Sequence, residues 1–82
     1  MRIIIFRGFN NSYYIISEEN APKIPKEILN ELLEKKHEVF NGNTEFLFSG
    51  GRHPEVEQIK NQITKPNLLN NLEEKGFLKV VL

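Results

Sequence analysis

The chain has 82 residues, of which 39% are hydrophobic and 27% are charged, a composition typical of one small globular domain with a single core. Eleven basic and eleven acidic side chains cancel, so no field of the whole molecule attracts nucleic acid or anionic lipid. The absence of cysteine excludes disulfides, thiolate catalysis and cysteine-ligated zinc.

The apolar run at the start, Ile3 to Phe6, is shorter than the core of a signal peptide, which takes roughly 7 to 15 residues. No segment approaches the roughly 20 apolar residues of a membrane-spanning helix. We therefore expect a cytoplasmic protein without a membrane segment, folded as one domain over residues 1–82.

Two strand-like runs open the chain. Arg2 to Arg7 encloses four apolar residues without alternation, which is typical of a strand that is covered on both faces. Turn-forming residues follow at 8–11, and Tyr13 to Ile16 makes a second run of strand formers. The pattern predicts a β-hairpin over residues 2–17, with its first strand in the centre of a sheet.

A helix is predicted from Pro25, which suits the first helical position because it has no N–H to leave unpaired. Its apolar stripe consists of Ile28, Leu29, Leu32 and Leu33.

Two interpretations remain open for Asn41-Gly42. The dipeptide is typical of a two-residue hairpin turn before a strand at 44–48. We favour the other interpretation, in which the helix continues to about Val39 and Gly42 ends it.

The stretch from Thr44 to Ile63 predicts a strand, a tight loop and a helix. Strand formers at 46–48 stop at the small residues 49–51. His53 then takes the N-cap position and Pro54 the first helical position. The apolar stripe of this helix consists of Val56, Ile59 and Ile63.

Thr64 begins a third helix as its cap or as a hinge, and Gly76 ends that helix in the left-handed conformation before a last strand at 77–82. The predicted fold is α+β, with the order β-β-α-β-α-α-β, about four strands and two to three helices. A strand that returns to a sheet through a helix usually runs parallel. We therefore expect a mixed sheet.

The loop between the predicted third strand and second helix is the leading candidate site. Adjacent glycines allow backbone N–H groups to converge, the following helix adds its positive dipole end, and arginine and serine add donors. If the first and third strands are parallel neighbours, Arg7 emerges at the same edge and completes a two-arginine clamp for a phosphate or carboxylate. The candidate ligand-binding residues are Ser49, Gly50, Gly51, Arg52, His53 and Arg7.

Other features oppose an anion at this loop. Pro54 removes one N–H from the turn that an anion would use. Glu55 and Glu57 already place negative charge at the start of the helix. The glycine spacing matches neither of the common phosphate-binding motifs. A simple strand-to-helix turn that needs glycine is the competing interpretation.

Catalytic and metal sites are not predicted. His37 and His53 are the only histidines, too few for a metal site without a coincidence of the fold. Ser49 and His53 lie in one loop without an orienting acid in a known motif, so we assign no catalytic residue. We expect no cofactor.

Four aromatic residues are candidate anchors for a protein partner: Phe9, Tyr13, Tyr14 and Phe40. Together these side chains provide more aromatic surface than a small sheet needs for its core. We expect ordinary core packing for at least two of the four.

The sequence favours a small non-enzymatic binding protein, a regulator or inhibitor that acts by contact with a protein partner. The alternative is a module that binds a phosphate-bearing small molecule or nucleotide at 49–53, with an enzyme third. A net charge of zero favours a homo-oligomer. Glutamates alternate with lysines along the helix from Pro25, which argues against nucleic-acid binding. Small chains rich in asparagine and lysine are associated with short regulatory proteins of viruses and mobile elements.

Overall fold

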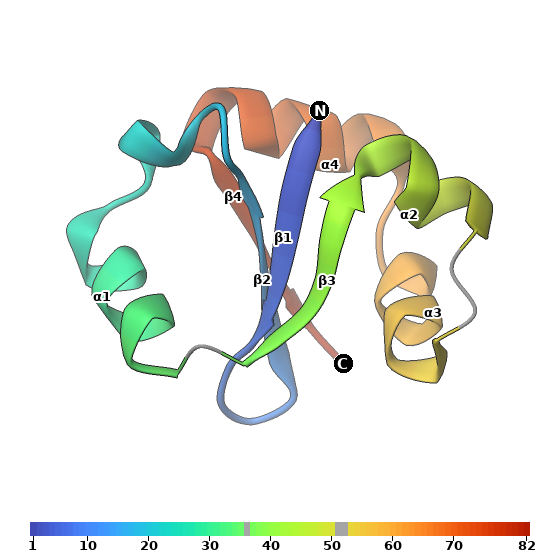
Figure 1. Ribbon diagram of the computed structural model, residues 1–82, viewed down its shortest axis with the longest axis horizontal. Helices are drawn as coiled ribbons and strands as arrows, with labels where there is room; N and C mark the ends of the chain where they lie inside the picture. The colour runs from blue at the N-terminus through green and yellow to red at the C-terminus, as the bar shows by residue number, and fades with distance from the viewer. Residues whose placement is uncertain (36, 51–52) are drawn as a thin grey trace.

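Four strands form one sheet, and helices cover both of its faces (Figure 1). The computed structural model describes residues 1–35, 37–50 and 53–82. In chain order the elements are β1 (Arg2–Arg7), β2 (Ser12–Ser17), the 3₁₀ helix η1 (Ala21–Lys23), α1 (Lys26–Lys35), β3 (Glu38–Asn43), α2 (Thr44–Gly50), α3 (Pro54–Asn61), α4 (Lys65–Lys75) and β4 (Phe77–Val81). The predicted α+β class and the four strands are confirmed.

The strand order in the sheet is β3-β1-β2-β4, so β1 and β2 are central and β3 and β4 are the edges. The predicted hairpin is confirmed, because β1 pairs with β2 in antiparallel register. The expectation of a mixed sheet is wrong, since β3 also pairs antiparallel with β1 and β4 pairs antiparallel with β2. Strands β2 and β3, which α1 connects, do run in the same direction, but β1 lies between them and pairs antiparallel with both, so no two neighbouring strands are parallel.

The strand predicted at 44–48 is wrong: these residues form helix α2. Thr44 and Leu47 are buried three residues apart, whereas Phe46 between them is exposed. That spacing is helical, because a strand would place Thr44 and Phe46 on the same face. A run of only three apolar residues does not distinguish the two periods in the sequence. The loop at 49–53 therefore connects two helices.

Both interpretations of Asn41-Gly42 are wrong, because the dipeptide lies inside strand β3. Gly42 pairs with Ile3 and Phe40 pairs with Ile5 in the ladder with β1. The side chain of Asn41 accepts a hydrogen bond from Arg2 Nη2 at 2.7 Å. Pairing with the central strand thus overrides the turn preference of the dipeptide.

The predicted helix boundaries after residue 53 are confirmed. His53 is the N-cap of α3, with Pro54 in its first turn. The side chain of Thr64 caps α4 by accepting from the N–H of Asn67. Gly76 ends α4 with φ 81, in the left-handed region. Helix α1 differs slightly: it begins at Lys26, and the carbonyl of Pro25 accepts from its first turns.

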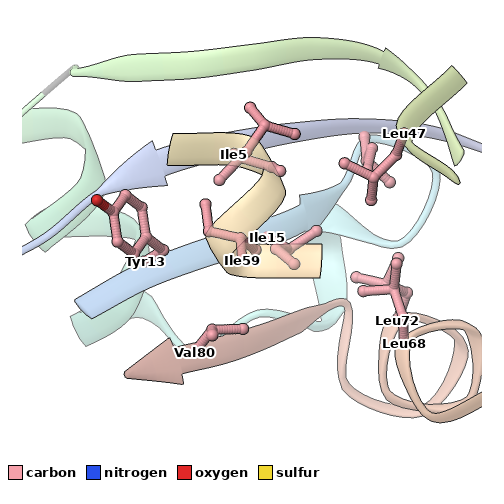
Figure 2. Close-up of a cluster of buried hydrophobic side chains, with 10 residues drawn as sticks. Ile5, Tyr13, Ile15, Leu47, Ile59, Leu68, Leu72 and Val80 are labelled. Carbon is pink, nitrogen blue, oxygen red and sulfur yellow. The ribbon is translucent and has the colours of Figure 1, made fainter. Parts of the chain in front are cut away.

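The core lies between one face of the sheet and the helices α2, α3 and α4 (Figure 2). Its buried members are Ile3, Ile5, Tyr13, Ile15, Leu47, Val56, Ile59, Leu68, Leu72 and Val80. Helix α1 covers the opposite face (Figure 1), where its Leu32 is buried. The continuous apolar runs of β1 and β2 are explained by this covering on both faces. None of the described helices combines the length and apolarity that crossing a membrane requires.

Candidate functional site

The predicted binding loop falls between α2 and α3. Ser49 and Gly50 are the last residues of α2, and His53 is the N-cap of α3. Gly51 and Arg52 lie outside the described residues. The hydroxyl of Ser49 donates to the carbonyl of Glu45 at 2.6 Å, so it serves its own helix. His53 caps α3 without a side-chain hydrogen bond.

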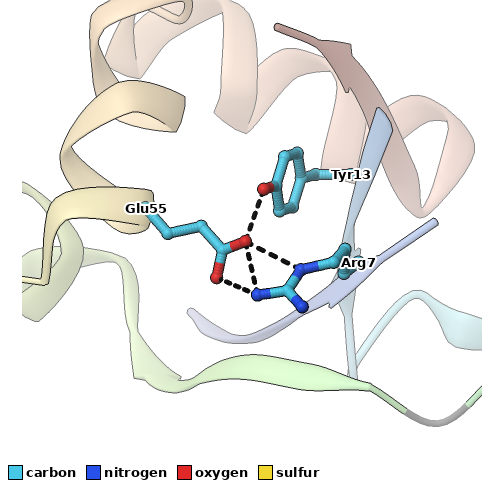
Figure 3. Close-up of polar contacts among 3 residues, drawn as sticks. All are labelled: Arg7, Tyr13 and Glu55. Atoms are coloured by element: carbon cyan, nitrogen blue, oxygen red, sulfur yellow. Dashed lines mark hydrogen bonds and ion pairs between the residues drawn. The ribbon is translucent and has the colours of Figure 1, made fainter. Parts of the chain in front are cut away.

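At the start of α3, Glu55 binds two residues of the first hairpin (Figure 3). Arg7 donates from Nε to Oε2 at 2.8 Å and from Nη2 to Oε1 at 2.7 Å, which is a bidentate pair. The hydroxyl of Tyr13 donates to the same Oε2. Arg7 and Tyr13 are direct cross-strand partners in the hairpin. The cluster of Arg7, Tyr13 and Glu55 therefore joins the first turn of α3 to the end of β1 and the start of β2.

Burial and the contacts within the cluster shift the pKa of each of its three groups. The hydrogen bond from Arg7 lowers the pKa of Glu55, and the bond from Tyr13 acts in the same direction, while burial opposes both. Burial raises the pKa of Tyr13, and its bond to Glu55 adds to this effect. The bond to Glu55 raises the pKa of Arg7. At neutral pH the cluster thus holds an ionised carboxylate, a neutral phenol and a guanidinium cation.

This geometry bears directly on the clamp expected from the sequence. Arg7 does reach the start of α3, although β1 and β3 are antiparallel and not parallel as that clamp assumed. The carboxylate of Glu55 occupies the bidentate face of its guanidinium. An added phosphate or carboxylate would have to compete with Glu55, which is covalently tethered beside Arg7. The cluster is well suited to hold α3 against the sheet.

Glu55 was not among the candidate site residues. The hairpin prediction alone could have placed Arg7 beside Tyr13, because both flank the same turn. Glu55 is 48 residues from Arg7 in the chain, and no local pattern links the two. Only the packing of α3 on the sheet brings them together.

The four candidate partner anchors separate into two groups. Tyr13 and Tyr14 are buried, and the ring of Phe40 packs against the core. The expectation that at least two of the four serve core packing is therefore confirmed. Phe9 is different, because 62% of it is exposed. Its role as a partner anchor remains a prediction.

Phe9 lies in the turn that joins β1 and β2. Asn10 and Asn11 both have positive φ, 54 and 60, a conformation that asparagine tolerates better than most residues. The N–H and hydroxyl of Ser12 both donate to the carbonyl of Phe9, which closes the turn. Two asparagines in the turn thus fix the backbone that carries Phe9.

The end of β4 and the residue that follows it, Leu82, lie beside this turn. Ser12 pairs with Val81, and the N–H of Leu82 donates to the carbonyl of Asn11 at 3.0 Å. Val81 is 60% exposed and Leu82 is 37% exposed. We name Phe9, Val81 and Leu82 the hairpin-end surface. An open pocket of about 180 Å³ adjoins it, lined by Gln58, Asn61, Gln62 and Leu82.

The described ranges 1–35, 37–50 and 53–82 hold no group of three or more histidine or acidic side chains placed to bind a metal ion. Comparison of the chain with protein-family models, with curated proteins and with solved structures gave no match.

Proposed function

We propose that this protein is a small non-enzymatic binding protein that modulates a protein partner by contact through the hairpin-end surface. The observation that carries the proposal is the exposure of Phe9 and Val81 at the same end of the sheet, where Ser12 donates to the carbonyl of Phe9 and pairs with Val81. Burying a side chain of this kind stabilises a complex by about 1.5 to 3 kcal/mol. A partner that covers both residues would gain only the part of that free energy that corresponds to their exposed fractions, 62% for Phe9 and 60% for Val81.

The backbone around Phe9 supports this proposal. The turn is closed by two hydrogen bonds from Ser12, and Leu82 is tied to Asn11. A ring that is presented on a fixed backbone loses little conformational entropy when a partner covers it. Aromatic residues held in this way are the usual anchors of protein interfaces.

The test is a pull-down from the native host with the purified protein and two matched variants. Phe9→Ser removes the aromatic ring from the hairpin-end surface. Phe46→Ser removes an equally exposed ring, 67% accessible, from α2 near the opposite end of β1. We expect the wild type and Phe46→Ser to capture the same partner and Phe9→Ser to lose most of it, with circular dichroism confirming that both variants fold. Capture of that partner by Phe9→Ser at the wild-type level would refute the proposal.

A phosphate-bearing ligand at 49–53 is the second candidate function. The observation in its favour is that Arg7 reaches Glu55 in the first turn of α3, the helix that His53 caps. The engagement of Arg7 by Glu55 weighs against it. A thermal-shift assay with inorganic phosphate and a nucleotide panel separates the two functions, because only a ligand that binds the native state raises Tm. A shift that survives Arg52→Ala would exclude this loop as its site.

A further inference from the structure

The outer edge of β4 presents a defined set of backbone groups. In an antiparallel pair, alternate residues exchange hydrogen bonds with the partner strand and the others point away from it. Leu82 donates to Asn11, and Gly76 accepts from Ser17, at the two ends of the pairing with β2. The even-numbered residues of β4 therefore bond to β2. The N–H and C=O groups of the odd-numbered residues, Phe77, Lys79 and Val81, point outward.

These outward groups lie on the last strand of the sheet, the brown-red strand β4 in Figure 2. Phe77, Lys79 and Val81 lie opposite residues of β2 in the register, but their own N–H and C=O groups point away from it. Within the described part of the chain, no other backbone hydrogen bond is found for these three residues. An edge of this kind is a template for another strand.

The side chains of the same three residues point to the face covered by α1, because they alternate with the core residue Val80. Lys79 is exposed, and its Nζ lies 5.8 Å from the centre of the Tyr14 ring. No acidic group is ion-paired with Lys79 among the residues that the structure describes. The edge therefore offers one positive charge between the apolar residues Phe77 and Val81.

We propose that the outer edge of β4 binds an extended strand of a protein partner, with an acidic residue opposite Lys79 and apolar residues opposite Phe77 and Val81. This inference rests on the proposed function and names the class of partner. The backbone of the partner supplies hydrogen bonds to the three outward residues. The carboxylate pairs with Lys79, and cross-strand pairs of opposite charge stabilise a sheet.

A second copy of this chain fits the edge less well. Two β4 strands use all their outward groups only when Phe77 of one copy lies opposite Val81 of the other. That register places Lys79 directly opposite Lys79, and like charges in this position are destabilising. Edge lysines commonly prevent self-pairing for this reason. The same lysine thus selects a partner strand that carries the opposite charge.

The test uses capped synthetic peptides of about six residues, the usual length of a strand. One is rich in valine and threonine with a central glutamate, and its control has lysine at that position. Amide hydrogen exchange by NMR reports the edge directly. In the free protein we expect Phe77, Lys79 and Val81 to exchange faster than Leu78 and Val80. The glutamate peptide should protect the three fast amides.

Charge reversal then tests the role of Lys79. Wild type should bind the glutamate peptide at least about fivefold more tightly than the lysine peptide, and Lys79→Glu should reverse this preference. Equal binding of both peptides, or no added protection at the three amides, would overturn the proposal. So would sedimentation of the free protein as a dimer with these amides already protected, because the edge would then belong to a second copy.

The outcome is separable from that of the proposed function. Phe9 lies in the hairpin turn and not on β4, so Phe9→Ser should keep the preference for the glutamate peptide. If Phe9→Ser loses partner capture and the wild type binds neither peptide, the proposal for the hairpin-end surface stands and only the proposal for the β4 edge is refuted. If the wild type binds the glutamate peptide and Phe9→Ser still captures the partner, the proposal for the hairpin-end surface is refuted instead.

Discussion

Replacing Gly76 by alanine should destabilise the fold strongly, because Gly76 is the C-cap of α4 and directly precedes β4. Its φ of 81 lies in the left-handed region, which costs a residue with a side chain about 1 to 2 kcal/mol. A Cβ at this position would also overlap the carbonyl oxygen of Asn20 and lie 2.9 Å from Cγ1 of Ile24. Overpacking of this kind typically costs about 1 to 3 kcal/mol.

The two effects together predict a loss of about 2 to 4 kcal/mol for Gly76→Ala, after allowing for the lower entropy of the unfolded alanine chain. For a domain of this size that corresponds to a fall in Tm of roughly 10 to 25 °C. Gly76→Asn separates the causes, since asparagine tolerates the left-handed region but keeps the Cβ. We expect it to recover only part of the loss, because the overlap with Asn20 remains.

Gly42→Ala is the matched control. The Cβ added at Gly42 would meet the flexible ring of Phe40 at 3.2 Å and no backbone atom, and Gly42 has no positive φ. Urea unfolding followed by far-UV circular dichroism gives the free energy of each variant. The reasoning is refuted if Gly76→Ala stays within about 1 kcal/mol of wild type, or if Gly42→Ala loses as much as Gly76→Ala.

Two further predictions concern the start of α3 and of α4. Glu55→Gln should lower the free energy of unfolding by about 1 kcal/mol at pH 7, more than Glu57→Gln on the same turn, because Glu55 accepts from both Arg7 and Tyr13. The pKa of Glu55 is lowered in the folded state, so this stabilisation is complete above its unfolded-state pKa and disappears as the pH falls through the folded-state pKa. Urea unfolding from pH 7 to pH 3 should show the free energies of unfolding of Glu55→Gln and Glu57→Gln converging in acid. A difference between them that stays constant with pH would contradict this. Thr64→Ala should cost about 1 kcal/mol by removing the cap on the N–H of Asn67, while Thr64→Ser should stay close to wild type in the same assay. Equal stability of the alanine and serine variants would show that the cap does not contribute.

Much of the fold was predictable because its signals are local. The left-handed end at Gly76, the cap at Thr64 and the proline start of α3 each depend on a few neighbouring residues, and all three are confirmed. The first hairpin belongs to the same group, since its two strands are joined by a short turn. The burial of Tyr13 and Tyr14 was also predictable, since ordinary core packing was expected for at least two of the four aromatic residues.

The sequence alone determined which short segments have a strong preference of their own, namely the hairpin, the capped helices and the last strand. Tertiary structure decided the rest: residues 44–50 are helical because Thr44 and Leu47 pack inward together, and Asn41-Gly42 is extended because β1 pairs with it. It also decided that Arg7 binds Glu55, a residue far away in the chain. Short apolar runs and distant charges carry little local preference, so their structure follows from the free energy of packing against residues far away in the chain.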